Sequence, residues 1–186
     1  MSDQDPRSEI ETHLAAMRAF ALSLTRNPSL ADDMVQDSIV KAWTNIDKFE
    51  VGTNMRAWLF TILRNTYYSN RRKFKREVLD RDGIFASRLS EKPAHDGRLQ
   101  MRDFLRAFEQ LPDEQREALI LVGAEGFSYE EAAQTCGVAL GTIKSRVNRG
   151  RKVLSEMLDL EGSGSLEITD KTTMAIVSAG VAAATR

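Results

Sequence analysis

The chain has 186 residues, a formal net charge of −1 and a single cysteine. This length suits one domain or two small ones, and a lone cysteine excludes an internal disulfide and fits a reducing cytoplasm. Two separated histidines and one cysteine make no zinc-ligand spacing, and no phosphate-binding loop or nucleophile motif is present, so the sequence argues against an enzyme and predicts no metal and no cofactor.

The N-terminal part of the chain is predicted to form three helices, over residues 13–24, 29–46 and 54–75. Asn27 followed by Pro28 marks the start of the second helix, because proline is tolerated in a first helical turn. One side of that helix is predicted to be an apolar stripe, and the other is an acidic face that is either a binding surface or ordinary solvated surface. The stripe holds Ala31, Val35, Ile39, Ala42, Trp43 and Ile46, and the acidic face holds Asp33, Gln36 and Asp37.

The third predicted helix and the loop before it are basic and aromatic. Residues 51–76 contain seven Lys and Arg and no Asp or Glu. Positive charges suit phosphates and flat rings suit unstacked bases, so this run indicates a nucleic-acid contact, with a solvated basic face as the plain alternative. Trp58 and Phe60 are expected mostly in the core, whereas Tyr68 and an exposed Phe49 are expected on the DNA side.

The middle of the chain changes in composition. Residues 77–97 mix both signs of charge and contain glycine and proline, which is typical of a linker, although the short apolar segment around residues 84–89 can also dock on another surface. A second helical unit is predicted over residues 98–160. Its first two helices are expected at residues 99–110 and 113–123.

The last two helices of this unit have the pattern of a helix-turn-helix. Ser128 and Glu131 form a capping box that starts the first helix, and Gly137 suits the left-handed turn that ends it. The second helix is predicted from about Thr142. The segment of residues 132–155, which includes most of this helix, contains five Lys and Arg and no acidic residue. Its polar face is therefore predicted to enter the major groove of DNA. The opposite stripe holds Ile143, Val147, Gly150, Leu154 and Met157.

Residues 161–186 are predicted to be a flexible tail that begins with a Gly- and Ser-rich tether. Its apolar run at residues 174–184 is too short to span a bilayer, so it is either frayed or docked on a partner. The polar, acidic N-terminus has no secretory signal, and we expect a cytoplasmic protein with no membrane partner.

Four segments are similar, in the right order, to motifs of one family, the extracytoplasmic-function (ECF) sigma factors. Residues 31–38 resemble the family's region 2.2, and residues 56–65 resemble region 2.4. Residues 111–117 and 141–146 both resemble region 4. The expected fold is all-α, with two small helical domains: an N-terminal unit (sigma region 2, residues 9–76) and a C-terminal unit (sigma region 4, residues 98–160), joined by a flexible linker over residues 77–97.

This resemblance implies a function in transcription initiation, with core RNA polymerase and promoter DNA as partners. Residues 52–69 are similar to the EcfG group of general stress sigma factors, which implies a NepR-like anti-sigma factor displaced by a PhyR-type regulator. Region 2.2 implies polymerase contacts at Asp33, Gln36 and Asp37. Contacts to the −10 promoter element are expected at Phe49, Thr53, Asn54, Arg56, Arg64, Asn65, Tyr68, Arg71 and Arg72, and contacts to the −35 element at Thr142, Lys144, Ser145, Arg146, Asn148, Arg149 and Lys152.

Two other functions fit parts of the sequence. A stand-alone helix-turn-helix regulator would use only the C-terminal unit and leave the acidic and basic helices of the N-terminal unit unexplained. A sigma-like decoy that binds only an anti-sigma factor would have no need of two basic DNA faces.

Overall fold

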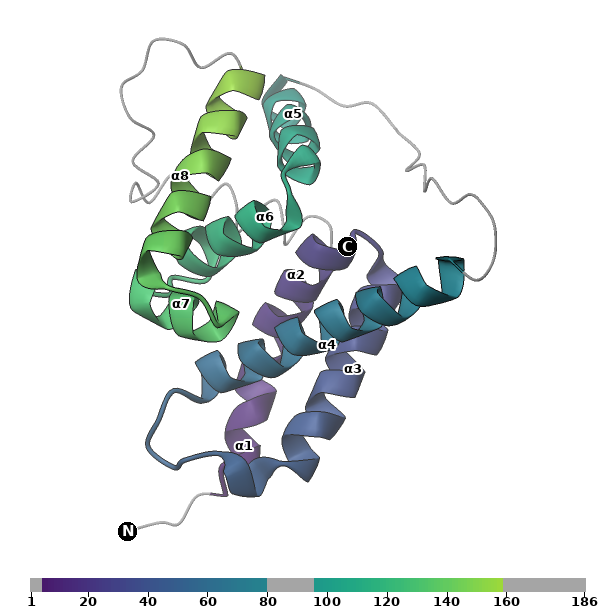
Figure 1. The fold of residues 1–186 in the computed structure, drawn as a ribbon, viewed down its shortest axis with the longest axis vertical. Coiled ribbons are helices and arrows are strands. Elements are labelled where there is room, and N and C mark those ends of the chain that lie inside the picture. The colour runs from purple at the N-terminus through teal and green to yellow at the C-terminus, as the bar shows by residue number, and fades with distance from the viewer. Residues whose placement is uncertain (1–4, 80–95, 159–186) are drawn as a thin grey trace.

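The computed structural model describes residues 5–79 and 96–158, and every regular element within these ranges is a helix (Figure 1). The predicted all-α class is therefore confirmed. The predicted tail over residues 161–186 and most of the predicted linker over residues 77–97 lie outside the described residues, and both stay predictions.

The N-terminal unit is a bundle of three long helices, of which α3 packs against both α2 and α4 (Figure 1). The side chains of Met17, Phe20, Leu59, Phe60 and Leu63 fill its centre and are fully buried. The elements are α1 (Arg7–Ile10), the 3-10 turn η1 (Glu11–His13), α2 (Leu14–Thr25), α3 (Pro28–Thr44), the 3-10 turn η2 (Ile46–Lys48) and α4 (Met55–Leu79).

Helix α3 begins as predicted and ends earlier than predicted. The Asn27 side chain accepts a hydrogen bond from the Leu30 backbone N–H at 3.1 Å, with Pro28 in the first turn. The predicted apolar stripe is wrong at Trp43, which is 53 % exposed although its neighbour Ala42 is fully buried. One residue rotates a helix by about 100°, so Trp43 turns away from the core once Ala42 faces it.

The C-terminal unit contains a confirmed helix-turn-helix. Ser128 and Glu131 make both hydrogen bonds of the capping box, and Gly137 ends the first helix in the left-handed conformation, with φ of 64°. The predicted helix at residues 113–123 changes to a π-helical turn partway along. The elements are α5 (Asp96–Gln110), α6 (Asp113–Leu119), the π turn η3 (Ile120–Ala124), α7 (Tyr129–Cys136) and α8 (Leu140–Met157).

Helix α8 lies on α6 through the predicted apolar stripe. Ile143, Val147 and Leu154 are buried, whereas Met157 at the end of the stripe is 45 % exposed, so that part of the prediction is wrong. The crossing is close at Gly150, where an added Cβ would lie 2.7 Å from Leu119 Cδ1. Only a residue without a side chain lets the two helices approach this closely.

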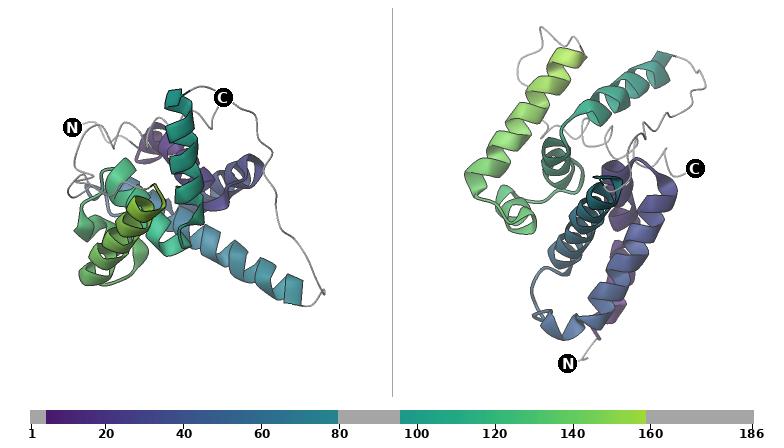
Figure 2. Two further views of the ribbon diagram at one scale, coloured as in Figure 1. Left: turned by 90° about the horizontal axis from the view of Figure 1, so that it is seen from above. Right: turned by 45° about the vertical axis from the view of Figure 1, so that its right-hand side comes forward.

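The two units pack against each other and share one continuous core. In Figure 1 the C-terminal unit lies against the N-terminal half of α4, while α8 stands clear of the N-terminal unit in the right-hand view of Figure 2. The Phe60 ring lies 5.0 Å from the Phe20 ring within its own unit and 5.3 Å from the Phe127 ring of the other unit. Phe127 is itself buried, so the contact between the units includes an apolar seal.

Candidate nucleic-acid interface

The acidic face of α3 is exposed, as expected for a binding surface. Asp33, Gln36 and Asp37 all lie on the solvent side of the helix. Apolar side chains that the sequence did not assign to this face lie beside them, because Leu30 and Val40 are more than half exposed, as Trp43 is. A surface that combines carboxylates with exposed large apolar groups is typical of a protein-binding site rather than of plain solvated surface.

The loop before α4 folds back on the helix and buries the ring expected to face DNA. Phe49 is 8 % exposed, and its ring lies 5.3 Å from that of Trp58. The expected exposed Phe49 is therefore wrong, because the η2 turn directs the ring onto α4, and in this arrangement it does not meet a base directly. Thr53 stays exposed, and the Asn54 side chain caps α4 by accepting from the Ala57 backbone N–H at 3.0 Å.

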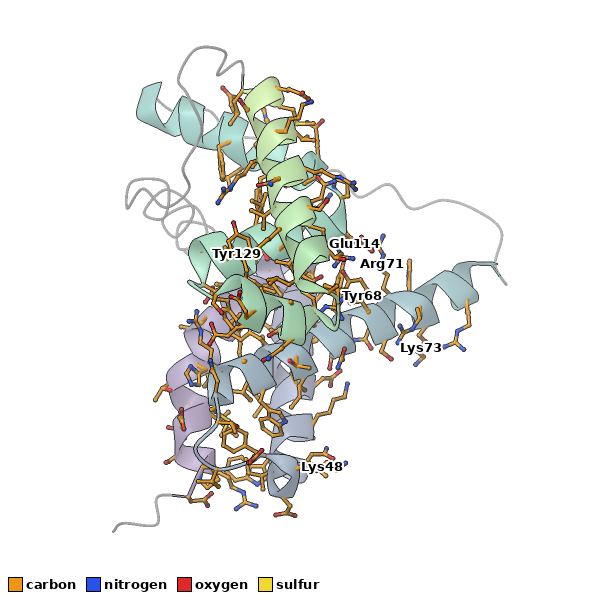
Figure 3. All side chains as sticks on the ribbon, turned by 60° about the vertical axis from the view of Figure 1, so that its left-hand side comes forward. Lys48, Tyr68, Arg71, Lys73, Glu114 and Tyr129 are labelled. Atoms are coloured by element: carbon orange, nitrogen blue, oxygen red, sulfur yellow. The ribbon has the colours of Figure 1, made fainter. Side chains whose placement is uncertain are left out.

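One side of α4 is covered by the C-terminal unit. We call it the covered face and define it as the side chains there that contact the C-terminal unit: Asn54, just before the helix, and Arg56, Arg64, Tyr67, Tyr68 and Arg71. Figure 3 shows Tyr68 and Arg71 extending from α4 toward the start of α6, near Glu114, whereas Lys73 extends from another side of the helix. The polar groups of this face meet carboxylates: Asn54 meets Glu131, Arg56 meets Glu125, Arg64 meets Glu117, and Arg71 meets Asp113.

Glu117 is the most buried carboxylate in this contact. Its side chain is fully inaccessible, and its Oε1 lies 2.6 Å from Arg64 Nε, while Oε2 accepts from the Tyr68 hydroxyl at 3.2 Å. Burial raises the pKa of the Glu117 carboxyl, and the Arg64 charge opposes that rise. The guanidinium of Arg64 also lies over the Tyr68 ring, 4.6 Å from its centroid. Arg64 and Tyr68 are thus tied to α6 and do not project into solvent.

The other side of α4 is exposed to solvent. We call it the open face and define it as Asn65, Ser69, Arg72 and Arg76, at helical spacing. The predicted −10 residues therefore divide: Asn65 and Arg72 are accessible, whereas Arg56 and Arg64 are engaged by the C-terminal unit. The sequence placed all of them in one basic run and did not separate these two sides.

Most of the polar side of α8 is exposed to solvent. Thr142, Lys144, Asn148, Arg149 and Lys152 are all accessible, and Ser145 and Arg146 are half-buried. A shallow hollow of about 400 Å³ lies between this helix and the start of α6. Arg146 pairs with Glu114 at 3.0 Å, and Lys152 approaches Glu156 at 3.8 Å, so each of these cations has a carboxylate partner within the C-terminal unit. The hollow is lined by Pro112, Glu114, Gln115, Gly141, Thr142, Ser145, Arg146 and Arg149.

The sequence analysis assigned no role to the acidic residues of the C-terminal unit that pair with α4. Between residues 113 and 131 the chain has six Asp and Glu and one basic residue, Arg116. This is the reverse of the basic run at residues 51–76, and opposite charge runs in two halves of a chain are a signal for a contact between them. Arg116 itself is buried and donates to the Glu109 and Leu111 carbonyl oxygens, so it holds the junction of α5 and α6.

The described part of the chain contains no candidate metal site, and its cysteine is not exposed. Within residues 5–79 and 96–158, no group of three or more His, Cys, Asp or Glu side chains is placed to hold a metal ion. Cys136 is buried in the core, and burial raises the pKa of its thiol to about 12. None of the helices in these two ranges is both long and apolar enough to cross a membrane.

Comparison with known families gives two matches that follow the two units. Residues 10–77 match the model of sigma-70 region 2, and residues 101–154 match that of sigma-70 region 4.

Individual relatives give the same result. The chain is 52 % identical to the ECF RNA polymerase sigma factor EcfG of Rhodopseudomonas palustris over 157 residues, which are 84 % of this chain and 87 % of that protein. It is also similar to the sigma factor RpoE of Bartonella quintana, solved in complex with the anti-sigma factor NepR, with a TM-score of 0.75 and 51 % identity over 85 % of this chain and 99 % of that one. CnrH, solved in complex with the cytosolic domain of CnrY, has a TM-score of 0.59 and 26 % identity over 83 % and 88 % of the two chains.

Proposed function

The chain belongs to the ECF sigma factors of the sigma-70 family, and we propose how its surfaces divide the work of promoter-specific transcription initiation. Three separate surfaces are involved: the acidic face of α3, the basic helix α4 and the polar face of α8. A sigma factor needs a contact to core polymerase and contacts to two promoter elements, and these three surfaces match that requirement. Because polymerase and chromosome share one compartment, the site of action is the cytoplasm.

The acidic face of α3 binds core polymerase. Asp33, Gln36 and Asp37 supply the charge and hydrogen-bonding groups, and the exposed side chains of Val40 and Trp43 add apolar area beside them. Buried aromatic anchors next to charged groups are the usual source of affinity and orientation in protein interfaces. The partner surface is therefore basic with an apolar patch.

Helix α4 meets the −10 element. Asn65 offers an amide that can read a base edge, and Arg72 offers a charge for phosphates, as does Arg71 once it is released from Asp113. The remaining polar groups of the covered face, including Arg56 and Arg64, become available when the C-terminal unit moves away. Thr53 and Asn54 at the start of α4 border the loop where a flipped base would lie.

Helix α8 reads the −35 element. What most supports this division of work is that the polar face of α8 is exposed on a capped helix-turn-helix and is accessible along most of its length. Lys144, Asn148 and Arg149 are the side chains for base edges, with Thr142 and Ser145 beside them near the helix start. Arg146 and Lys152 are placed for phosphates, because each already pairs with a carboxylate that a phosphate can replace.

The regulon is that of the general stress response, under an anti-sigma factor of the NepR type. The likeness to a protein named EcfG and to a sigma factor solved with NepR supports this assignment. Both likenesses cover more than four fifths of the chain, so they extend over both units and not over the DNA-binding motif alone.

Reconstituted transcription tests the proposed function. The purified chain is added to core polymerase of Rhodopseudomonas palustris with a pool of promoter fragments, and transcripts are sequenced. Specific initiation that depends on the chain is expected, and Asp37→Arg should weaken polymerase binding at least tenfold, as for a charge reversed in an interface. Asp47→Arg, the same change at another exposed position, is the control. A decoy would give no transcript, and a stand-alone regulator would bind promoters equally well without polymerase.

A further inference from the structure

A groove with apolar walls lies between α3 and α4 of the N-terminal unit, and we call it the α3–α4 groove. It has a volume of about 560 Å³, and it is lined by the buried side chains of Leu24 and Met34 and by Tyr67. Leu30 on α3 and Phe74 on α4 also line it, and they are 55 % and 59 % exposed. Large apolar side chains gathered in water beside one groove are typical of a surface that another segment covers.

The two sides of the α3–α4 groove differ in charge. Asp33 and Asp37 lie one turn apart on α3, whereas Arg71 and Lys73 lie on α4. Arg71 is paired with Asp113. Among the residues that the structure describes, the two exposed carboxylates of α3 have no ion-pair partner. The groove therefore fits an apolar segment that has a positive charge beside it.

The tail of the same chain contains a segment of this composition. Residues 174–184 have no charged side chain, and from Lys171 to Arg186 there are two basic residues and no Asp or Glu. Segments that lie in apolar grooves often present anchors at the spacing of one helical side. Three apolar residues of the tail have this spacing: Met174, Val177 and Val181.

The tail is long enough to reach the α3–α4 groove. Helix α8 ends at Met157, and the fifteen residues 159–173 connect its end to the apolar segment. Fifteen extended residues span about 50 Å, whereas α4, with 25 residues, is about 38 Å long. The groove also opens near the C-terminal unit, because α2, which contributes Leu24 to it, contacts α6 (Figure 1). Tethering raises the local concentration of a segment to about the millimolar range, so a weak apolar contact is enough.

We propose that residues 174–184 dock in the α3–α4 groove of the same chain and that core polymerase displaces them. Docking covers Leu30 and Phe74 and brings Lys171 to the carboxylates of α3. Asp33 and Asp37 belong both to the groove and to the face proposed to bind polymerase, so the tail and polymerase exclude each other. The displacement rests on the proposed function of α3, whereas the docking does not.

A photo-cross-linker in the groove of the full-length chain tests the docking. Phe74→p-benzoylphenylalanine places a reactive ketone on the groove wall, and Val51→p-benzoylphenylalanine, at a position that is 77 % exposed and outside the groove, is the control. Trypsin cuts after Lys171, so residues 172–186 form one peptide that mass spectrometry can identify. In the monomer band, the cross-linker at position 74 should capture this peptide and the one at position 51 should not. Capture of only a second copy or of other segments, or no capture, would overturn the docking.

A charge placed in the tail gives a second test with a matched control. Val177→Asp adds a carboxylate to the apolar segment and should lower the yield of the cross-link from position 74 about tenfold, because a docked carboxylate would leave water without a partner. Ser165→Asp adds the same charge before this segment and should leave the yield unchanged. Circular dichroism checks that both variants are folded. Equal yields in the two variants contradict docking through the apolar segment.

The same cross-link tests displacement. Core polymerase added in excess before irradiation should lower the yield at position 74 about tenfold, and bovine serum albumin at the same concentration should not. An unchanged yield on a chain that co-purifies with polymerase would show that the two partners bind together and that displacement is wrong. A chain that does not bind polymerase contradicts the proposed function instead, while the yield without polymerase still decides the docking.

Discussion

Helices α4 and α8 are both basic, but one side of α4 is covered by the other unit, whereas the polar side of α8 is exposed to solvent. Each presents a run of Lys and Arg without acidic residues, and each is assigned to one promoter element. On α8 the polar side faces solvent, and its ion pairs are made within its own unit. On α4 the cations of one side are engaged by the carboxylates of the other unit. A basic run thus indicates that a helix can bind phosphates, and its neighbours decide whether it is free to do so.

The largest expected effect separates the two halves of α4. Phe60→Ala removes a fully buried ring that packs within its own unit and against Phe127, and should lower the free energy of unfolding by about 3–5 kcal/mol. Phe74→Ala, on the exposed half of the same helix at 59 % exposure, should change it by less than about 0.5 kcal/mol. Urea denaturation followed by circular dichroism measures both. Similar losses would mean that the ends of α4 are equally buried in solution.

A second test compares one arginine from each basic helix. Arg149→Ala on α8 should cost about 1–3 kcal/mol of binding to a duplex selected from a random-sequence pool, which is roughly ten- to hundredfold in affinity. Arg64→Ala on α4 should leave this affinity unchanged in the chain by itself, because its guanidinium is already paired with Glu117. Electrophoretic mobility shifts measure both constants. If the Arg64 variant loses as much as the Arg149 variant, Arg64 contacts DNA in spite of its pairing with Glu117.

Two glycines of α8 test how closely this helix must lie on α6. Gly150→Ala places a methyl group 2.7 Å from Leu119 Cδ1 and should destabilise the chain by about 1–3 kcal/mol. Gly141→Ala adds the same group where no atom lies within 4 Å, and should stabilise it by about 0.4–1 kcal/mol through the unfolded state. Thermal unfolding of the two variants provides the measurement. An unaffected Gly150 variant would show that Leu119 moves aside and that close crossing is not required.

The smallest expected effect is the pH dependence of stability that Glu117 contributes where α6 contacts α4. Burial raises the pKa of the Glu117 carboxyl. A carboxyl whose pKa is raised by folding stabilises the folded state most below its unfolded pKa, and this contribution is lost as the pH rises through the folded pKa. The unmodified chain should therefore gain stability relative to Glu117→Gln as the pH is lowered from 7 toward 4.5. Urea titrations at the two pH values measure the difference, and Glu114→Gln corrects for the loss of one charge from α6. A gain toward higher pH would mean that Arg64 outweighs burial.

The sequence by itself determined the local structure and the chemistry of the surfaces. The Asn27 cap, the Ser128–Glu131 capping box and the turn at Gly137 depend on residues within a few positions of one another, and all three are confirmed. The stripe of Ile143, Val147 and Leu154 is likewise set by helical periodicity, which acts over a single element. The family motifs lie on these same short segments.

Only the tertiary structure decided which side chains are available. Phe49, expected to be exposed, is buried, and Trp43, expected in the apolar stripe, is exposed. Their burial depends on a turn and on a neighbouring helix, which helical periodicity does not describe. The division of α4 into a covered and an open face depends on Glu117 and Glu125, which lie more than fifty residues away in the chain. Helical periodicity indicates which residues share a side of a helix, but the partner that covers that side is chosen by long-range packing.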